Sequence, residues 1–154
     1  MDERPIPRFN HVALSVSADC LDEAGRGALL DFYGEVFGFT EMPTMTVDRE
    51  LLVLRCFSNE QFVYIHASDT PMQCGAMEHF GMSVATPDEL FAMHERARKY
   101  KEREPEVELT DTGLDDFKVV KLHNFYTRYR LPMMIEIQCF EWANGIGAES
   151  LPEG

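Results

Sequence analysis

Residues 11–16 read His-Val-Ala-Leu-Ser-Val, and residues 79–84 read His-Phe-Gly-Met-Ser-Val. Both stretches alternate between apolar residues and polar or small ones, which is typical of a strand with one buried face. A second pair of stretches corresponds in the same way, because Phe-Val-Tyr-Ile-His at 62–66 matches the alternation of Met-Ile-Glu-Ile-Gln at 134–138. The chain therefore contains an internal repeat, and we expect two modules of one fold, at about 8–68 and 76–142.

Each opening strand is followed by apolar residues at helical spacing. Gly38 is expected to end the first helix. Thr86 is predicted to cap the second, with Pro87 at its first position and Glu89 completing a capping box. The strand-like runs that follow are at 39–46, 51–57 and 61–67 in the first half, and at 105–110, 117–129 and 133–141 in the second. Each half thus reads βαβββ.

Strand alternation assigns the polar residues of four strands to one face and the apolar residues to the face that packs on the helices. The predicted fold class is α+β: the two modules form a curled eight-strand sheet with the helices outside. Its concave interior is expected to carry His11, Tyr64, His66, His79 and Glu136. Converging polar groups between apolar neighbours need partners, which a metal supplies. Two imidazoles and a carboxylate suit Fe(II), Mn(II), Zn(II) or Ni(II), so His11, His79 and Glu136 are candidate ligands.

Composition limits the class of protein. The 154 residues, 45% of them apolar, are enough for a single domain spanning 1–154. A net charge of −13 repels polyanions and anionic membrane surfaces, so neither nucleic acid nor membrane is an expected partner. Four scattered cysteines, no apolar signal region and no long apolar run indicate a cytoplasmic protein with free thiols. Residues 145–154 are expected to form a flexible end.

Two segments complement the candidate ligands. They are Leu-Asp-Phe-Tyr-Gly-Glu-Val-Phe-Gly-Phe at 30–39 and the late Ile-Glu-Ile at 135–137. On these residues, the sequence resembles the vicinal oxygen chelate superfamily over roughly residues 8–142. This superfamily includes glyoxalase I, methylmalonyl-CoA epimerase, extradiol dioxygenases and bleomycin resistance proteins. The resemblance implies metal ligands at His11, position 64, His79 and Glu136. Position 64 is Tyr64 where glyoxalase-like members carry Glu or Gln, so a four-ligand site would need His66 instead.

The extradiol dioxygenases use a His-His-Glu triad for Fe(II), with a tyrosine in a Phe-Tyr-x-Arg segment ahead of the Glu. Phe-Tyr-Thr-Arg at 125–128 stands in that place, so the resemblance implies a catalytic role for Tyr126. The match is partial, because the Pro-x-Gly of that family reads Arg-Leu-Pro at 130–132 and the expected upstream histidine is absent. His66 could act as acid or base by its location.

Three hypotheses follow. The first, slightly favoured, is an Fe(II) extradiol-type dioxygenase acting on a small oxygen-chelating substrate, with His66, Tyr126 and Tyr64 as candidate catalytic residues. The second is a lyase or isomerase of the glyoxalase or epimerase type, using Zn, Ni or Co. The third is a metal-free, antibiotic-binding resistance protein, which would not need His11, His79 and Glu136. The resemblance also implies a homodimer.

Overall fold

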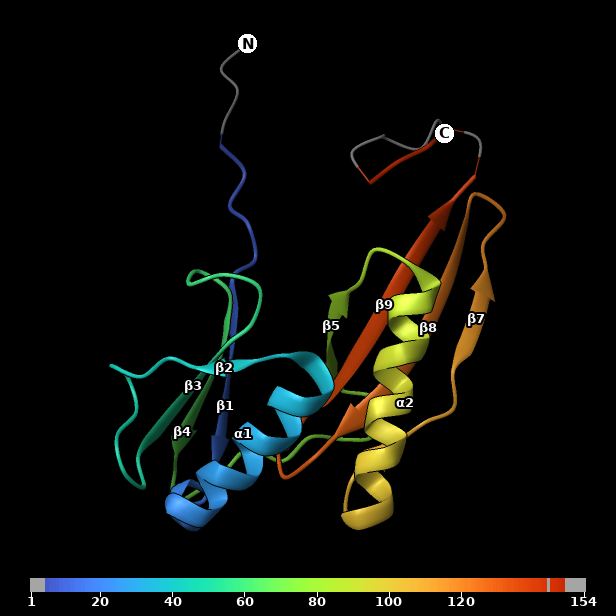
Figure 1. Ribbon diagram of the computed structural model, residues 1–154. Coiled ribbons are helices and arrows are strands. Elements are labelled where there is room, and N and C mark those ends of the chain that lie inside the picture. The colour runs from blue at the N-terminus through green and yellow to red at the C-terminus, as the bar shows by residue number, and fades with distance from the viewer. Residues whose placement is uncertain (1–4, 144, 149–154) are drawn as a thin grey trace. The chain divides into compact units, whose positions relative to one another are not determined.

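The computed structural model describes residues 5–143 and 145–148 (Figure 1). The expected flexible end lies partly outside the described residues, at 149–154. The chain divides into two compact units. The first unit contains the residues up to 34 and 38–72, and the second contains 35–37 and the residues from 73 onward.

The first unit holds a four-stranded sheet and one long helix. Its elements are β1 (His11–Val16), the 3-10 helix η1 (Ala18–Leu21), α1 (Glu23–Phe37) except for residues 35–37, β2 (Thr40–Glu41), β3 (Leu51–Arg55) and β4 (Phe62–Ala67). The strand order is β1-β4-β3-β2. β1 runs parallel to β4, and the other neighbours are antiparallel.

The second unit repeats this topology. Its elements are β5 (His79–Ser83), α2 (Pro87–Arg103), β6 (Glu108–Leu109), β7 (Gly113–Asp116), β8 (Val120–Arg128) and β9 (Met134–Trp142). The order is β5-β9-β8-β6, with β7 also on β8, and β5 runs parallel to β9 as β1 does to β4. The expected α+β fold with an internal repeat is confirmed.

The strands differ from expectation in their grouping and lengths. Within the described residues they form two separate sheets, of four and five strands, where one eight-strand sheet was expected. The second half has four strands after its helix, because the edge beside β8 is divided between β6 and β7. The run expected at 117–129 begins at 120, since the Phe117 amide donates to the Val120 carbonyl and Lys118 takes φ 68° in a turn.

The expected helix ends are present. Gly38 ends α1 with φ 76°, and its amide donates to the Gly34 carbonyl. This left-handed conformation suits glycine because it has no Cβ. At the start of α2, the Thr86 hydroxyl accepts from the Glu89 amide at 3.2 Å. The Glu89 carboxylate accepts from the Thr86 amide at 3.1 Å, which completes the capping box.

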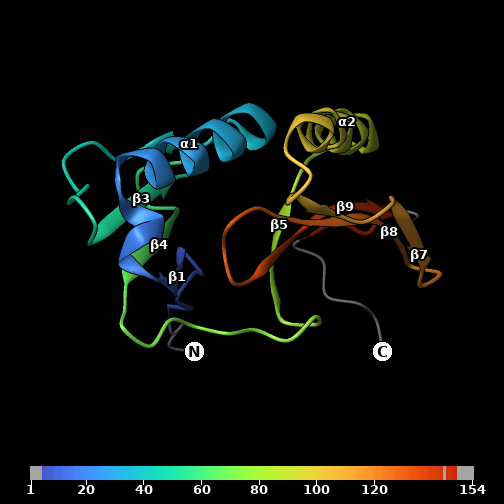
Figure 2. The ribbon, with the colours of Figure 1, turned by 90° about the horizontal axis from the view of Figure 1, so that it is seen from below.

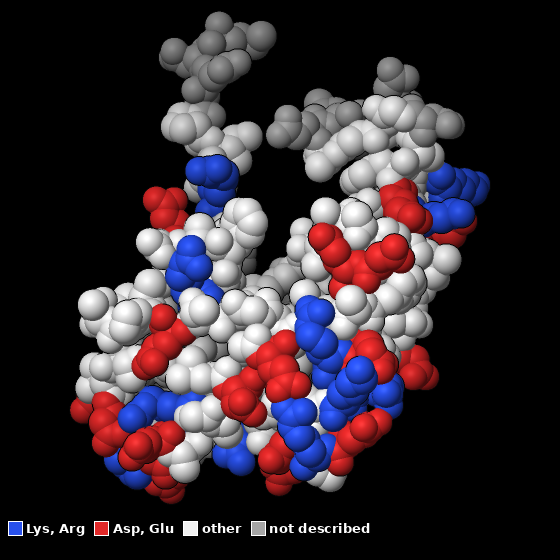
Figure 3. Space-filling view, viewed as in Figure 1, with Lys and Arg blue, Asp and Glu red and all other residues white. Residues whose placement is uncertain are grey.

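The helices cover the apolar faces of their own sheets (Figure 2). The core of the first unit includes Leu14, Leu29, Phe32, Leu52 and Ile65, and that of the second includes Leu90, Ala97, Phe125, Ile135 and Ile137. Charged side chains of both signs gather over α2 (Figure 3). No helix in the described part of the chain has the length and apolar character to cross a membrane. Each sheet packs one face against its helix, so the alternate residues of its strands form the opposite, polar face.

Candidate metal centre

Strand register places the candidate residues of the two repeats at equivalent positions. Gly81 on β5 is the register partner of Glu136 on β9. Ala13 on β1 is the register partner of Tyr64 on β4. Tyr64 therefore occupies in the first unit the position that Glu136 occupies in the second. The two units share a framework but carry different chemistry at this point.

Glu136 is a buried charge. Its exposed fraction is 5%, and it is the one buried carboxylate among the residues that the structure describes. It lies between Gly81 on one neighbouring strand and Tyr126 on the other. A carboxylate in this setting needs hydrogen bonds or a cation to offset the loss of water.

His79 supplies the first contact. Its Nε2 lies 3.1 Å from Oε2 of Glu136. Its Nδ1 lies 2.8 Å from the carbonyl oxygen of Met77, and a carbonyl can only accept, so Nδ1 carries the proton. A neutral His79 then presents the lone pair of Nε2 to a carboxylate oxygen, which is repulsive. A proton on Nε2, or a cation bound by both atoms, removes the repulsion.

Tyr126 supplies the second contact. Its ring centre lies 5.2 Å from that of His79, with the rings at 88°. Burial and then the hydrogen bond to Glu136 raise the pKa of Tyr126 above its ordinary value of 10.0. We call His79, Tyr126 and Glu136 the polar cluster. Three candidates from separate strands thus lie together, and Tyr126 is a neutral phenol at physiological pH.

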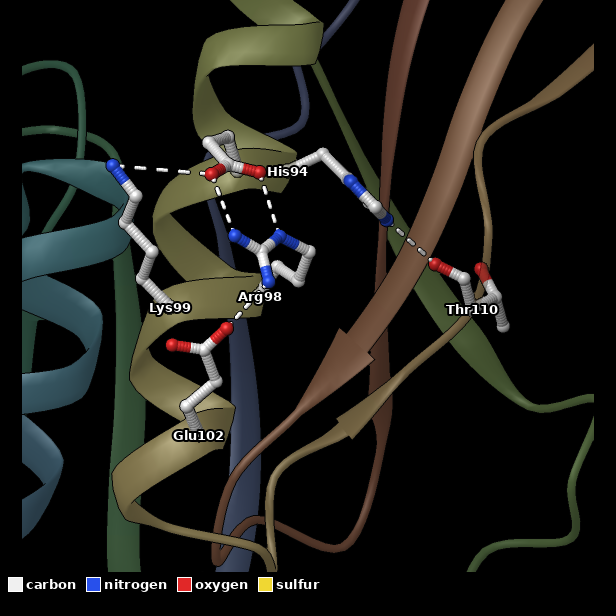
Figure 4. Close-up of polar contacts among 6 residues, drawn as sticks. His94, Arg98, Lys99, Glu102 and Thr110 are labelled. Atoms are coloured by element: carbon white, nitrogen blue, oxygen red, sulfur yellow. Dashed lines mark hydrogen bonds and ion pairs between the residues drawn. The ribbon is translucent and has the colours of Figure 1, made fainter.

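The backbone of Tyr126 is held by residues that the sequence did not point to. The Tyr126 amide donates to Oγ1 of Thr110 at 2.9 Å, and the Thr110 amide donates to the Tyr126 carbonyl at 3.0 Å. His94 reaches from α2 to the Thr110 carbonyl, with Nε2 at 2.8 Å (Figure 4). These contacts join positions sixteen residues apart, and no local motif signals them.

The first unit contains the remaining candidates. His11 is exposed, its Nδ1 lies 2.5 Å from Oδ1 of Asn10, and its ring stacks on Phe62 at 4.8 Å. With the side-chain oxygen of Asn10 as acceptor, Nδ1 of His11 is the donor, and in the neutral imidazole Nε2 carries the lone pair, as in His79. The rings of Tyr64 and His66 lie 6.0 Å apart on β4. His66 Nδ1 is 3.3 Å from the Ala67 carbonyl.

The donor set fits a divalent metal in chemical type. Metal-ligating histidines commonly donate one ring N–H to a backbone or side-chain oxygen, which fixes the other nitrogen as the ligand. His79 and His11 both have this arrangement. Among the described residues, no three His, Cys, Asp or Glu side chains are grouped to hold a metal. The second unit contributes two donors, Nε2 of His79 and the carboxylate of Glu136.

A second His–Glu pair lies on the helix-covered face of the same sheet. His123 Nε2 is 2.9 Å from Oε2 of Glu141. The His123 ring meets the edge of Phe91 from α2. Glu141 is half exposed, so water solvates its carboxylate, whereas the carboxylate of Glu136 is buried. The pair is a natural control for experiments on the polar cluster.

No protein-family model matches this chain, and no curated protein matches it either. Solved structures do match. A glyoxalase/bleomycin resistance protein/dioxygenase from Alicyclobacillus acidocaldarius is 15% identical, with a TM-score of 0.62, over 92% of this chain and 96% of the other. Lactoylglutathione lyase from Agrobacterium tumefaciens is 15% identical, with a TM-score of 0.59, over 88% and 96%.

A third match is the genomically encoded fosfomycin resistance protein FosX from Listeria monocytogenes, 15% identical, with a TM-score of 0.56, over 88% of this chain and 94% of the other. At this level of identity, the shared property is the fold. The chain has the fold of glyoxalase/bleomycin resistance/dioxygenase proteins, and the resemblance to the vicinal oxygen chelate superfamily is confirmed at that level.

Proposed function

We propose that this protein is a metal-dependent enzyme that acts on a small oxygen-chelating substrate, with His11, His79 and Glu136 as the metal ligands. The observation that carries the proposal is the 3.1 Å approach of His79 Nε2 to the buried Glu136 carboxylate. Two electron-pair donors this close need a positive charge between them, either a proton on His79 or a metal cation. A divalent cation supplies it and also offsets the burial of the carboxylate.

The third ligand of this proposal is His11. It opens the first repeat as His79 opens the second, and it has the same free nitrogen, because Asn10 occupies its Nδ1. Two imidazoles and one carboxylate leave coordination positions for a substrate, which is typical of the sites of Fe(II) oxygenases. Tyr64 replaces the carboxylate that a four-ligand site would use, so three protein ligands suit this chain better than four.

Fe(II) extradiol-type dioxygenation of a catechol-like substrate is the proposed reaction. When bound, the metal would hold two substrate oxygens and stabilise the charge that develops on them. Tyr126 is a phenol that keeps its proton at neutral pH, and a substrate oxygen beside His79 would compete with Glu136 for its hydrogen bond. His66 and Tyr64 are the proposed proton carriers of the first unit. We also propose a homodimer, which light scattering would test.

Metal content and ring cleavage test this proposal together. Protein purified anaerobically and reconstituted with Fe(II) is expected to bind about one equivalent and to consume oxygen with catechol. Glu136→Gln is expected to lose both properties. Glu141→Gln, at the control pair, is expected to keep both. Metal binding without oxygen consumption, or with Zn, Ni or Co in preference to iron, would instead support the lyase or isomerase alternative.

Tyr126→Phe separates catalysis from metal binding. It removes the hydroxyl but keeps the ring that contacts His79, so iron content is expected to stay at the wild-type level. Loss of a positioned proton donor is expected to slow turnover by about a hundredfold or more. Wild-type turnover in this variant would remove Tyr126 from the proposed mechanism.

A further inference from the structure

The polar face of β9 continues beyond the polar cluster and becomes apolar. Alternation puts every second residue of this strand on the face of Glu136. Cross-strand neighbours share a face, so β8 contributes the register partners of these residues. The surface therefore runs from Glu136 and Tyr126 through Gln138 and Asn124 to Phe140 and Leu122, and then to Trp142 and Val120.

Phe140 and Trp142, which we call the aromatic pair, form the apolar end of this surface. Their rings are nearly parallel, at 9°, with centres 6.0 Å apart. Their exposed fractions are 42% and 38%. Two large aromatic side chains on one strand face present a flat apolar platform, and its burial by a ligand is favourable.

The middle of the surface is polar and holds two amide side chains, with the Asp115 carboxylate of β7 beside them. Gln138 and Asn124 face each other across β9 and β8. Asn124 is held in place, since its Nδ2 donates to Oδ2 of Asp115 at 3.2 Å. Phe140 lies four positions along the strand from Glu136, which corresponds to about 13 Å. One sheet face therefore has an ionic end, a hydrogen-bonding middle and an aromatic end within the length of a single small molecule.

We infer that the substrate of the proposed site is amphipathic: its oxygen-chelating head binds at the polar cluster, and an aromatic body lies on the aromatic pair. This inference rests on the proposed function and adds the substrate class. The continuity of the face with His79 and Glu136 favours a small molecule as occupant over a second copy of the chain. A dimer formed by pairing of strand edges would not need this face.

Trp142 makes the inference directly measurable, because it is the one tryptophan in the chain. The probes are catechol and a catechol that carries a phenyl group on a four-carbon linker, each titrated into Fe(II)-loaded protein without oxygen. The linked compound is expected to quench Trp142 fluorescence saturably and to bind about tenfold tighter than catechol. Catechol alone is expected to bind without this quenching.

Matched variants test the contact. Phe140→Ala is expected to remove the tenfold advantage of the linked compound and to leave catechol affinity unchanged. Phe57→Ala removes a more exposed phenylalanine of the first unit, 88% exposed, and is expected to keep the advantage. The wild-type comparison of the two probes needs no variant, so it stands even if Phe140→Ala folds poorly.

The outcomes separate this inference from the proposed function. If metal and catechol bind but the phenyl group adds no affinity, the substrate class is wrong and the metal site stands. If the protein binds no metal but the linked compound still quenches Trp142, the proposed function fails and the aromatic subsite stands. If Phe140→Ala dissociates a dimer and Trp142 emission shifts with protein concentration, a second copy covers the pair and the inference is overturned.

Discussion

At the scale of single residues, the chemistry of the polar cluster depends on the burial of one carboxylate. Glu136 is the buried carboxylate of the described residues, and both of its contacts, His79 and Tyr126, are side chains with a proton to give or withhold. Ion pairs such as those of Arg98 with Glu95 and Glu102 are exposed (Figure 4). Exposed pairs of this kind contribute little to stability, so the polar cluster is where substitutions should change function.

Tyr126 should make the protein less stable at alkaline pH. Its folded-state pKa lies above the ordinary value of 10.0, so the fold holds the phenol proton more tightly than the unfolded chain does. The resulting stability is fully present below about pH 10 and is lost as pH rises through the folded-state pKa. Urea unfolding across this range should show a steeper alkaline loss in metal-free wild type than in Tyr126→Phe. Equal slopes would contradict the raised pKa.

Cys56 should be the least reactive of the more accessible thiols. Burial raises its pKa to about 12, so very little thiolate forms near neutral pH. Cys20 and Cys74 are also only partly buried. Labelling with a maleimide at neutral pH, followed by mass mapping, should find both labelled before Cys56. Labelling of Cys56 before Cys20 and Cys74 would contradict the raised pKa of its thiol.

At the scale of secondary-structure elements, the repeat could be read from the sequence because alternation and capping are local signals. The first helix ends at Gly38 and the second begins after Thr86, as the glycine and the capping box predict. β7 could not be predicted, because Gly-Leu-Asp-Asp at 113–116 has no apolar alternation and takes its strand conformation from pairing with β8. The support of Tyr126 by Thr110 was missed for a related reason, since it depends on that same strand edge.

The capping box gives the test at this scale. Thr86→Ala removes the hydroxyl that accepts from the Glu89 amide and should lower the free energy of unfolding by about 1 kcal/mol. Thr112→Ala, at an exposed position between β6 and β7, is the control and should change it little. Urea denaturation of both variants measures the difference. Equal stability of the two variants would mean that the cap contributes nothing to the fold.

At the scale of the whole molecule, the duplication explains how the candidate residues are distributed. Each unit has a histidine at the start of its first strand. Each also has a polar side chain at the equivalent position of its last strand, which is Tyr64 in the first unit and Glu136 in the second. Sequence alternation was enough to predict which residues share the polar face of each unit. It could not predict the 3.1 Å contact of His79 with Glu136, because side-chain rotamers and local carbonyls such as that of Met77 determine it.

Metal analysis of anaerobically purified, untagged protein is the decisive experiment on the proposed ligands. We expect near-stoichiometric iron in wild type and in Glu141→Ala, and its loss in His11→Ala, His79→Ala and Glu136→Ala. Loss in all three would support His11, His79 and Glu136 as the metal ligands. The absence of any metal from wild type after reconstitution would contradict the proposed metal site and favour a metal-free binding protein. Retention of iron in Glu136→Ala would show that Glu136 is not a ligand.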